Sequence, residues 1–121
     1  MNLGFTIAAA LTLLTWAIHT FVGGPAVAKP LLAAEMPVVP KLTNYYCWHL
    51  VTIVLLVMTA GFAYAAWVPA GQDVAVMSTI LAIAFTLWSL ALIIWKHRRP
   101  LQLPQWVLFL AISAAALAGL A

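Results

Sequence analysis

The sequence predicts an all-α fold, a four-transmembrane-helix bundle with up-down-up-down topology. Hydrophobic residues make up 67% of the 121 residues, charged residues make up 6%, and the mean hydropathy is +1.13. A water-soluble fold of this size cannot bury so much apolar surface. The apolar residues fall into four runs of roughly the length that crosses a hydrocarbon core of about 30 Å, and the charged residues lie outside these runs. We therefore expect one transmembrane domain, residues 1–121, with the lipid bilayer as its solvent.

The first helix is expected at residues 3–22, which just cross the hydrocarbon core at a rise of about 1.5 Å per residue. The next stretch, 23–42, begins with Gly23 and Gly24 and is rich in proline. Because proline disrupts a regular helix, we expect an ordered loop here that lies along the membrane interface. The prolines of this stretch are Pro25, Pro30, Pro37 and Pro40.

The second helix is expected at residues 44–68, because Thr43 or Asn44 can cap its start and Pro69 follows its end. The third is expected at residues 74–95. A basic turn at 96–100 separates it from the fourth, expected at 104–120, in which Pro104 occupies the first turn.

The positions of the basic residues predict the orientation. All five Lys and Arg residues fall in the first and third connections, and basic loops remain in the cytoplasm. We expect a multi-pass protein of a bacterial cytoplasmic (inner) membrane with both termini on the non-cytoplasmic side. The five residues are Lys29, Lys41, Lys96, Arg98 and Arg99.

Several function classes lack their usual signals. The net charge of +3 arises beside span ends and forms no extended basic face, so nucleic acid is not an expected partner. The single cysteine, Cys47, excludes an intrachain disulfide. No nucleophile elbow, phosphate-binding glycine loop or paired carboxylates occur, and we do not expect an enzyme.

A histidine pair is the most specific feature that could carry chemistry. His19 lies near the end of the first expected helix and His49 near the start of the second, so a hairpin brings both to similar depth at the cytoplasmic side. Trp16 shares a helical face with His19, and Tyr45 shares one with His49. Imidazoles on facing helices are what axial haem ligation requires, and Lys29 and Lys41 are placed to meet haem propionates. Haem b, a quinone or another small redox ligand is therefore one hypothesis.

Two alternatives use the same histidines. A metal ion would need more ligands than two, and Glu35 in the first connection is the available third donor beside His19 and His49. The simpler alternative is structural, because polar side chains commonly join membrane helices by hydrogen bonds.

Small residues recur at four-residue spacing, as in Gly61 with Ala65, Ser78 with Ala82 and Ala115 with Gly119. Such faces permit close helix packing, within the chain or between subunits of a homo-oligomer or a larger membrane complex. An accessory subunit without chemistry is thus a second function. A small-solute transporter is a third, although both acidic residues lie outside the expected spans.

Two resemblances follow from the first half of the chain. His19 to Pro25, the run Lys29 to Leu32, and Tyr46 to His49 with Thr52 resemble small bacterial four-pass inner-membrane proteins of uncharacterised activity. A histidine upstream of Gly23 and Gly24 at a helix end is also similar to copper-resistance-type and haem-binding four-helix membrane proteins. The second resemblance implies a copper or haem ligand near His19.

Overall fold

The chain is helical throughout, without strands, in a computed structural model that describes residues 1–121. A π-helix, η1, continues the first helix, α1, into the short helix α2, and short turns join α2 to α3, α3 to α4 and α4 to α5. The elements are α1 (Leu3–Ala17), η1 (Ile18–Ala28), α2 (Lys29–Ala33), α3 (Val38–Trp67), η2 (Pro69–Gly71), α4 (Gln72–Trp95), η3 (Pro100–Gln102) and α5 (Gln105–Leu120).

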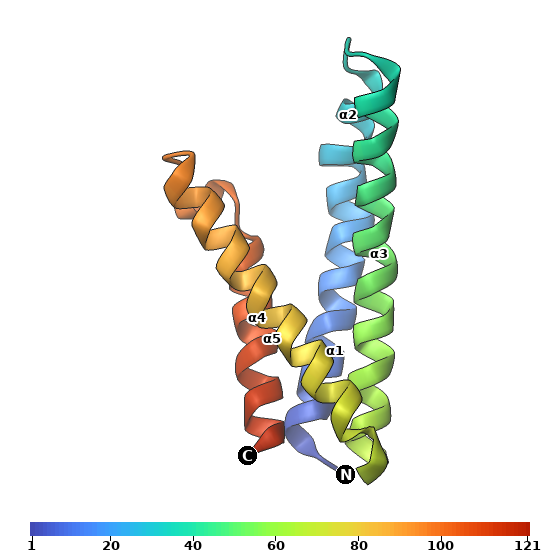
Figure 1. Cartoon of the computed structure of the whole chain (residues 1–121), viewed down its shortest axis with the longest axis vertical. Coiled ribbons are helices and arrows are strands. Elements are labelled where there is room, and N and C mark those ends of the chain that lie inside the picture. The colour runs from blue at the N-terminus through green and yellow to red at the C-terminus, as the bar shows by residue number, and fades with distance from the viewer.

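The helices form two antiparallel hairpins arranged as a V (Figure 1). The first hairpin pairs α1, η1 and α2 with α3, and the second pairs α4 with α5. Near the two chain termini α1 packs against α5 and α3 against α4, whereas at the opposite end the hairpins diverge. The helical bundle is therefore closed at the end of the termini and open at the other.

The closed half contains the hydrophobic core. Phe62, Leu55, Met58 and Ile112 are the largest fully buried apolar side chains. Phe5 stacks on Phe62 with ring centroids 6.4 Å apart and connects α1 to α3. Aromatic and aliphatic burial of this kind stabilises the junction between the hairpins.

Small residues set the distance between helices at this junction. A Cβ atom on Gly4 would overlap the backbone of Gly119 and lie 2.8 Å from the carbonyl oxygen of Ala115. A Cβ atom on Gly61 would lie 2.8 Å from the side chain of Val74 on α4. The small-residue faces at Gly61 and at Ala115 and Gly119 thus pack helices within the chain, one of the two uses that the sequence left open.

Hydroxyl side chains bond to their own helices. Thr79, Thr86 and Ser113 each donate to the carbonyl oxygen four residues earlier, at 2.7, 2.9 and 2.7 Å. Threonine and serine satisfy their hydrogen bonds in this way inside apolar helices. The hydrogen of each of these three hydroxyls is therefore used within its own helix.

The expectation of a non-helical loop at residues 23–42 is wrong. Helix continues to Ala33, resumes at Val38, and leaves 34–37 as the connection. Pro25 lies inside the π-helix η1, whose wider turns relieve the clash between a proline ring and the preceding turn. Pro40 lies in the first turn of α3 and Pro37 at its N-cap, where helix N–H groups have no intrahelical acceptor. Pro30 lies at the start of α2, where the π-helix passes into α-helix.

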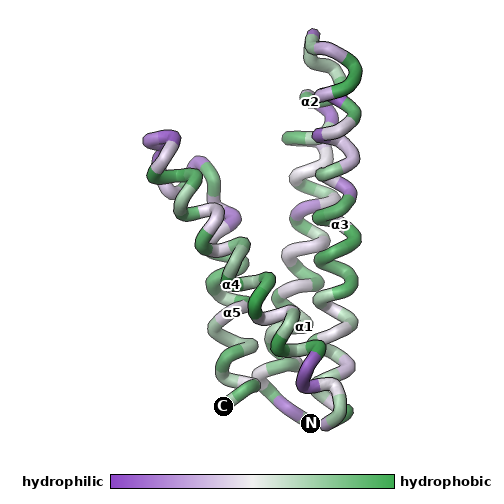
Figure 2. Tube along the Cα trace, viewed as in Figure 1, coloured by the Kyte–Doolittle hydropathy of each residue, from purple (hydrophilic) through white to green (hydrophobic).

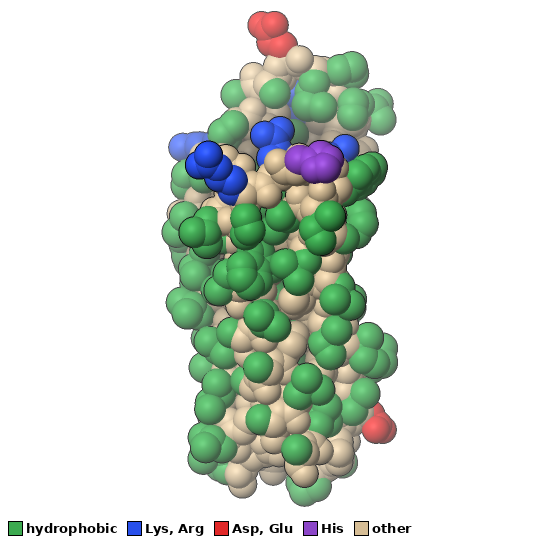
Figure 3. Space-filling view, turned by 90° about the vertical axis from the view of Figure 1, so that its left-hand side faces the viewer, with side chains coloured by type: hydrophobic (Ala, Val, Ile, Leu, Met, Phe, Trp, Pro, Cys, Tyr) green, Lys and Arg blue, Asp and Glu red, His purple; other side chains and the backbone are tan.

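Three helical segments are long and apolar enough to cross a membrane: Leu3–Ala33, Val38–Trp67 and Pro69–Trp95. Gln105–Leu120 is a shorter apolar helix. Hydrophilic residues concentrate toward the helix ends (Figure 2). On the face in Figure 3, basic side chains form a band toward one end, and the two acidic groups visible lie at opposite ends of the molecule.

Candidate functional site

His19 is held in a fixed orientation against α3. Its Nε2 atom lies 3.2 Å from the carbonyl oxygen of Trp48 and 3.1 Å from Oγ1 of Thr52. The imidazole also stacks on the Trp48 indole, with centroids 4.0 Å apart and planes 19° apart. Two polar contacts and a stacked ring together restrain this side chain.

The π-helix and Gly23 make this stack fit. A Cβ atom on Gly23 would lie 2.8 Å from Cη2 of Trp48, so the indole lies directly against the backbone of η1. Gly24, the next residue, has open space where its Cβ would be. Gly23 is therefore the glycine that this packing requires.

The His19 and Trp48 pair lines a cleft between the two hairpins. Two adjoining cavities of about 270 and 300 Å³ lie here and share His19, Trp48, Val51, Gln105 and Phe109. We call these two cavities together the cleft. Most of the other lining groups are apolar, among them Leu55 of α3, Phe85 and Trp88 of α4, and Leu108 of α5. An apolar cavity of this size with a few polar groups is typical of a site for a small molecule.

His49 lies outside the cleft. It is exposed, packs edge-on against Tyr45 with centroids 4.7 Å apart, and lines a separate pocket of about 220 Å³ with Lys29. His19 does not line that pocket. Because Trp48 lines both this pocket and the cleft, its side chain stands between them. The two histidines lie at similar depth along the hairpin, as the sequence predicted, but they serve different cavities.

The remaining candidate residues take other positions. Trp16 packs against the hydrophobic core and edge-on against Phe21, at a centroid distance of 5.9 Å. Lys41 lies in the first turn of α3, and Glu35 lies in the connection 34–37. Neither Lys41 nor Glu35 lines the cleft or the His49 pocket.

A donor set for a metal ion is not assembled. No group of three or more His, Cys, Asp and Glu side chains is placed to hold a metal ion, so Glu35 does not join His19 and His49. Ligation of haem iron through Nε2 of His19 would break the contacts of that atom with Trp48 and Thr52. The arrangement instead suits a ligand that meets the His19 ring without displacing it.

Sequence reasoning missed the second wall of the cleft. Gln105 and Phe109 of α5 face His19 across the cleft although they are far from it in the chain. The polar Gln105 at the start of an apolar run was a visible signal, but nothing in the chain indicates which hairpin it faces.

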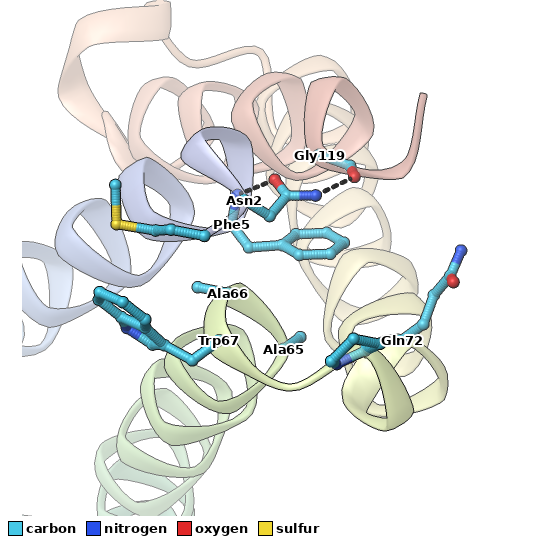
Figure 4. A pocket seen from close by; sticks show the side chains of 9 residues that line it. Asn2, Phe5, Ala65, Ala66, Trp67, Gln72 and Gly119 are labelled. Carbon is cyan, nitrogen blue, oxygen red and sulfur yellow. Dashed lines mark hydrogen bonds between the residues drawn. The ribbon is translucent and has the colours of Figure 1, made fainter.

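A further pocket, of about 400 Å³, lies at the closed end (Figure 4). Asn2 there donates through Nδ2 to the carbonyl oxygen of Gly119 at 2.7 Å and accepts from the N–H of Phe5 at 3.1 Å. Its backbone N–H donates to the carbonyl oxygen of Ala66 at 2.8 Å. These bonds join the N-terminus to α3 and α5, so the polar groups of Asn2 serve the junction of the hairpins.

Comparison with known proteins adds no relative, since no family model, curated protein or solved structure matches the chain.

Proposed function

We propose that the chain is a four-span protein of a bacterial cytoplasmic membrane whose cleft binds a small lipid-soluble ligand, with His19 as the polar anchor. The observation that carries this proposal is the restrained imidazole in the wall of an apolar cleft. A rigid polar group within apolar walls orients a ligand that is otherwise held by burial.

The apolar exterior supports the membrane location. Large apolar side chains are exposed over much of the surface, and an exterior this apolar favours lipid over water as its solvent. Leu3, Val57, Ile80 and Leu87 are examples that are more than half exposed. The fourth span is the shortest. At 16 residues, α5 is about 24 Å long at about 1.5 Å per residue, which approaches the thickness of the hydrocarbon core.

The charge distribution supports the orientation. The five basic residues lie at the open end of the V or in the connections there, and basic connections favour the cytoplasmic side. On this basis the cleft opens toward the cytoplasmic half of the bilayer and the termini lie on the far side.

Blocking the cleft tests ligand binding. Val51 lines both cavities of the cleft and is 37% exposed, so Val51→Phe fills space that a ligand would use. Val57 on the same helix is 62% exposed and lines none of the cavities described above, so Val57→Phe is the matched control. We expect the fluorescent apolar probe 1-aminoanthracene to bind the wild type and Val57→Phe in detergent, and Val51→Phe to lose at least about tenfold in affinity. Equal binding by the two variants contradicts the proposal.

An accessory subunit is the second candidate, favoured by the exposed wall of the cleft. Trp88 is 62% exposed although it lines the cleft, and a helix of a partner protein or of a second copy would cover it. Purification in mild detergent separates the two functions. A stoichiometric protein partner that Val51→Phe releases would favour this candidate over a small ligand.

A further inference from the structure

We infer that the ligand of the cleft is a ring compound that bears a hydroxyl group and donates its hydrogen bond to Nδ1 of His19. The inference rests on the proposed function and specifies its ligand class. It follows from the protonation of His19, from the free atom that remains, and from the aromatic walls.

The hydrogen bonds of His19 determine its tautomer. A carbonyl oxygen can only accept, and that of Trp48 lies 3.2 Å from Nε2, so Nε2 carries a hydrogen. Oγ1 of Thr52 lies 3.3 Å from the same carbonyl and donates to it, which leaves its lone pairs to accept from Nε2 at 3.1 Å. The hydroxyl and the imidazole therefore donate in the same direction.

Nδ1 is then the acceptor of the neutral ring. A charged imidazole would need a counter-charge, and the two acidic residues, Glu35 and Asp73, lie in a connection and at the start of α4. With Nε2 protonated, neutrality leaves an unshared pair on Nδ1.

No group of the chain uses this pair. Nδ1 makes no hydrogen bond within the chain, and it is not fully buried. Because His19 lines the cleft and its Nε2 is occupied, Nδ1 is the ring atom left to accept from a ligand there. A carbonyl or ether oxygen of a ligand has only lone pairs to offer, and these would repel the lone pair of Nδ1.

The walls favour a flat ligand. Trp48, Phe85, Trp88 and Phe109 line the cleft, and Phe85 meets Phe109 edge-on at a centroid distance of 5.1 Å. Aromatic walls favour ring ligands by stacked and edge-on contacts. Gln105 offers both a donor and an acceptor, so it does not distinguish a hydroxyl from an ether, and discrimination falls to His19.

A matched pair of probes tests the ligand class. 4-Hexylphenol donates a hydrogen bond, whereas 4-hexylanisole has the same ring and tail but no donor. Binding to the wild type in phosphatidylcholine nanodiscs is measured by equilibrium dialysis, with empty nanodiscs subtracting partition into lipid. We expect the phenol to bind about 2- to 12-fold more tightly, the ratio that one net hydrogen bond gives.

Two variants assign the preference to His19. His19→Phe keeps an aromatic ring for Trp48 to stack on but removes the acceptor, so the two probes should bind equally well. His49→Phe, in the neighbouring pocket, should keep the preference. The ¹⁵N chemical shifts of the wild type should show His19 with hydrogen on Nε2 alone, a measurement that does not depend on the folding of any variant.

The outcomes separate the two proposals. Equal affinity of the wild type for both probes, or tighter binding of the ether, overturns the hydroxyl ligand while the cleft keeps its function. Failure of the wild type to bind either probe above empty nanodiscs overturns both. Binding of phospholipid acyl chains alone, recovered by extraction of the purified protein, also overturns the ligand class.

Discussion

Gly23 and Gly24 are adjacent in sequence, but only Gly23 is in close contact with another helix. Gly23 lies against the Trp48 indole, whereas Gly24 faces open space. The sequence presents the two alike, as a pair that breaks a helix, and predicted neither role. The difference depends on which residue of α3 lies opposite, and that is decided by the register of the hairpin.

Alanine substitutions at these two positions should therefore differ in their effect on stability. Gly23→Ala forces Trp48 away from the His19 ring and should lower the free energy of unfolding by about 1–3 kcal/mol. Gly24→Ala adds a methyl group without a clash and should leave stability unchanged or raise it by about 0.5–1 kcal/mol. Unfolding in mixed micelles followed by circular dichroism measures both. Similar losses in the two variants would refute the stack.

At the scale of the element, the junction of α1 with α5 depends on two glycines in backbone contact. A Cβ atom on Gly119 would lie 2.5 Å from Cδ1 of Phe5, and one on Gly4 would overlap the backbone of Gly119. The spacing of Ala115 and Gly119 predicted a packing face. Gly4, the residue that contacts them, belongs to no such spacing, so the sequence does not indicate its role.

Gly4→Ala should separate α1 from α5, since backbone atoms cannot move aside as a side chain can. We expect a loss of about 1–3 kcal/mol in the free energy of unfolding. Ala10→Val adds more volume on the same helix at an exposed position and should change stability by no more than about 0.5 kcal/mol. Chemical unfolding of the two variants in the same detergent decides the point, and a Gly4→Ala protein as stable as Ala10→Val would show that the helices do not meet there.

Helix η1 shows why proline content misled the prediction for residues 23–42. The sequence rule assumes an α-helix, in which proline loses a bond to the residue four before it and clashes with that turn. In the π-helix η1, which leads directly into α2, the turns are wider. Pro40 lies in the first turn of α3 and Pro37 at its N-cap, where proline loses no intrahelical bond. The geometry of the turns removed the penalty on which the rule depends.

For the whole molecule, the two acidic residues provide natural markers of the two ends. Glu35 and Asp73 are both exposed, Glu35 in the connection at the open end and Asp73 at the start of α4 near the closed end. In a Cys47→Ala background, Asp73→Cys should react with a membrane-impermeant maleimide in intact spheroplasts. Glu35→Cys should react only after the membrane is permeabilised. The reverse pattern would invert the proposed orientation, and labelling of both from one side would contradict a membrane-spanning hairpin.

The sequence by itself determined that the chain is helical and that the helix surfaces suit lipid, because local periodicity and hydropathy depend only on neighbours along the chain. It also placed the third and fourth helices within two residues of their bounds, whereas the first two helices are longer than expected. It also placed His19 and His49 at one level. Only the tertiary structure decided that the hairpins diverge, that Trp48 separates the two histidines, and that Gln105 and Phe109 complete the cleft. Contacts between hairpins depend on the rotation of each helix about its axis, and a uniformly apolar helix has no polar face to reveal that rotation.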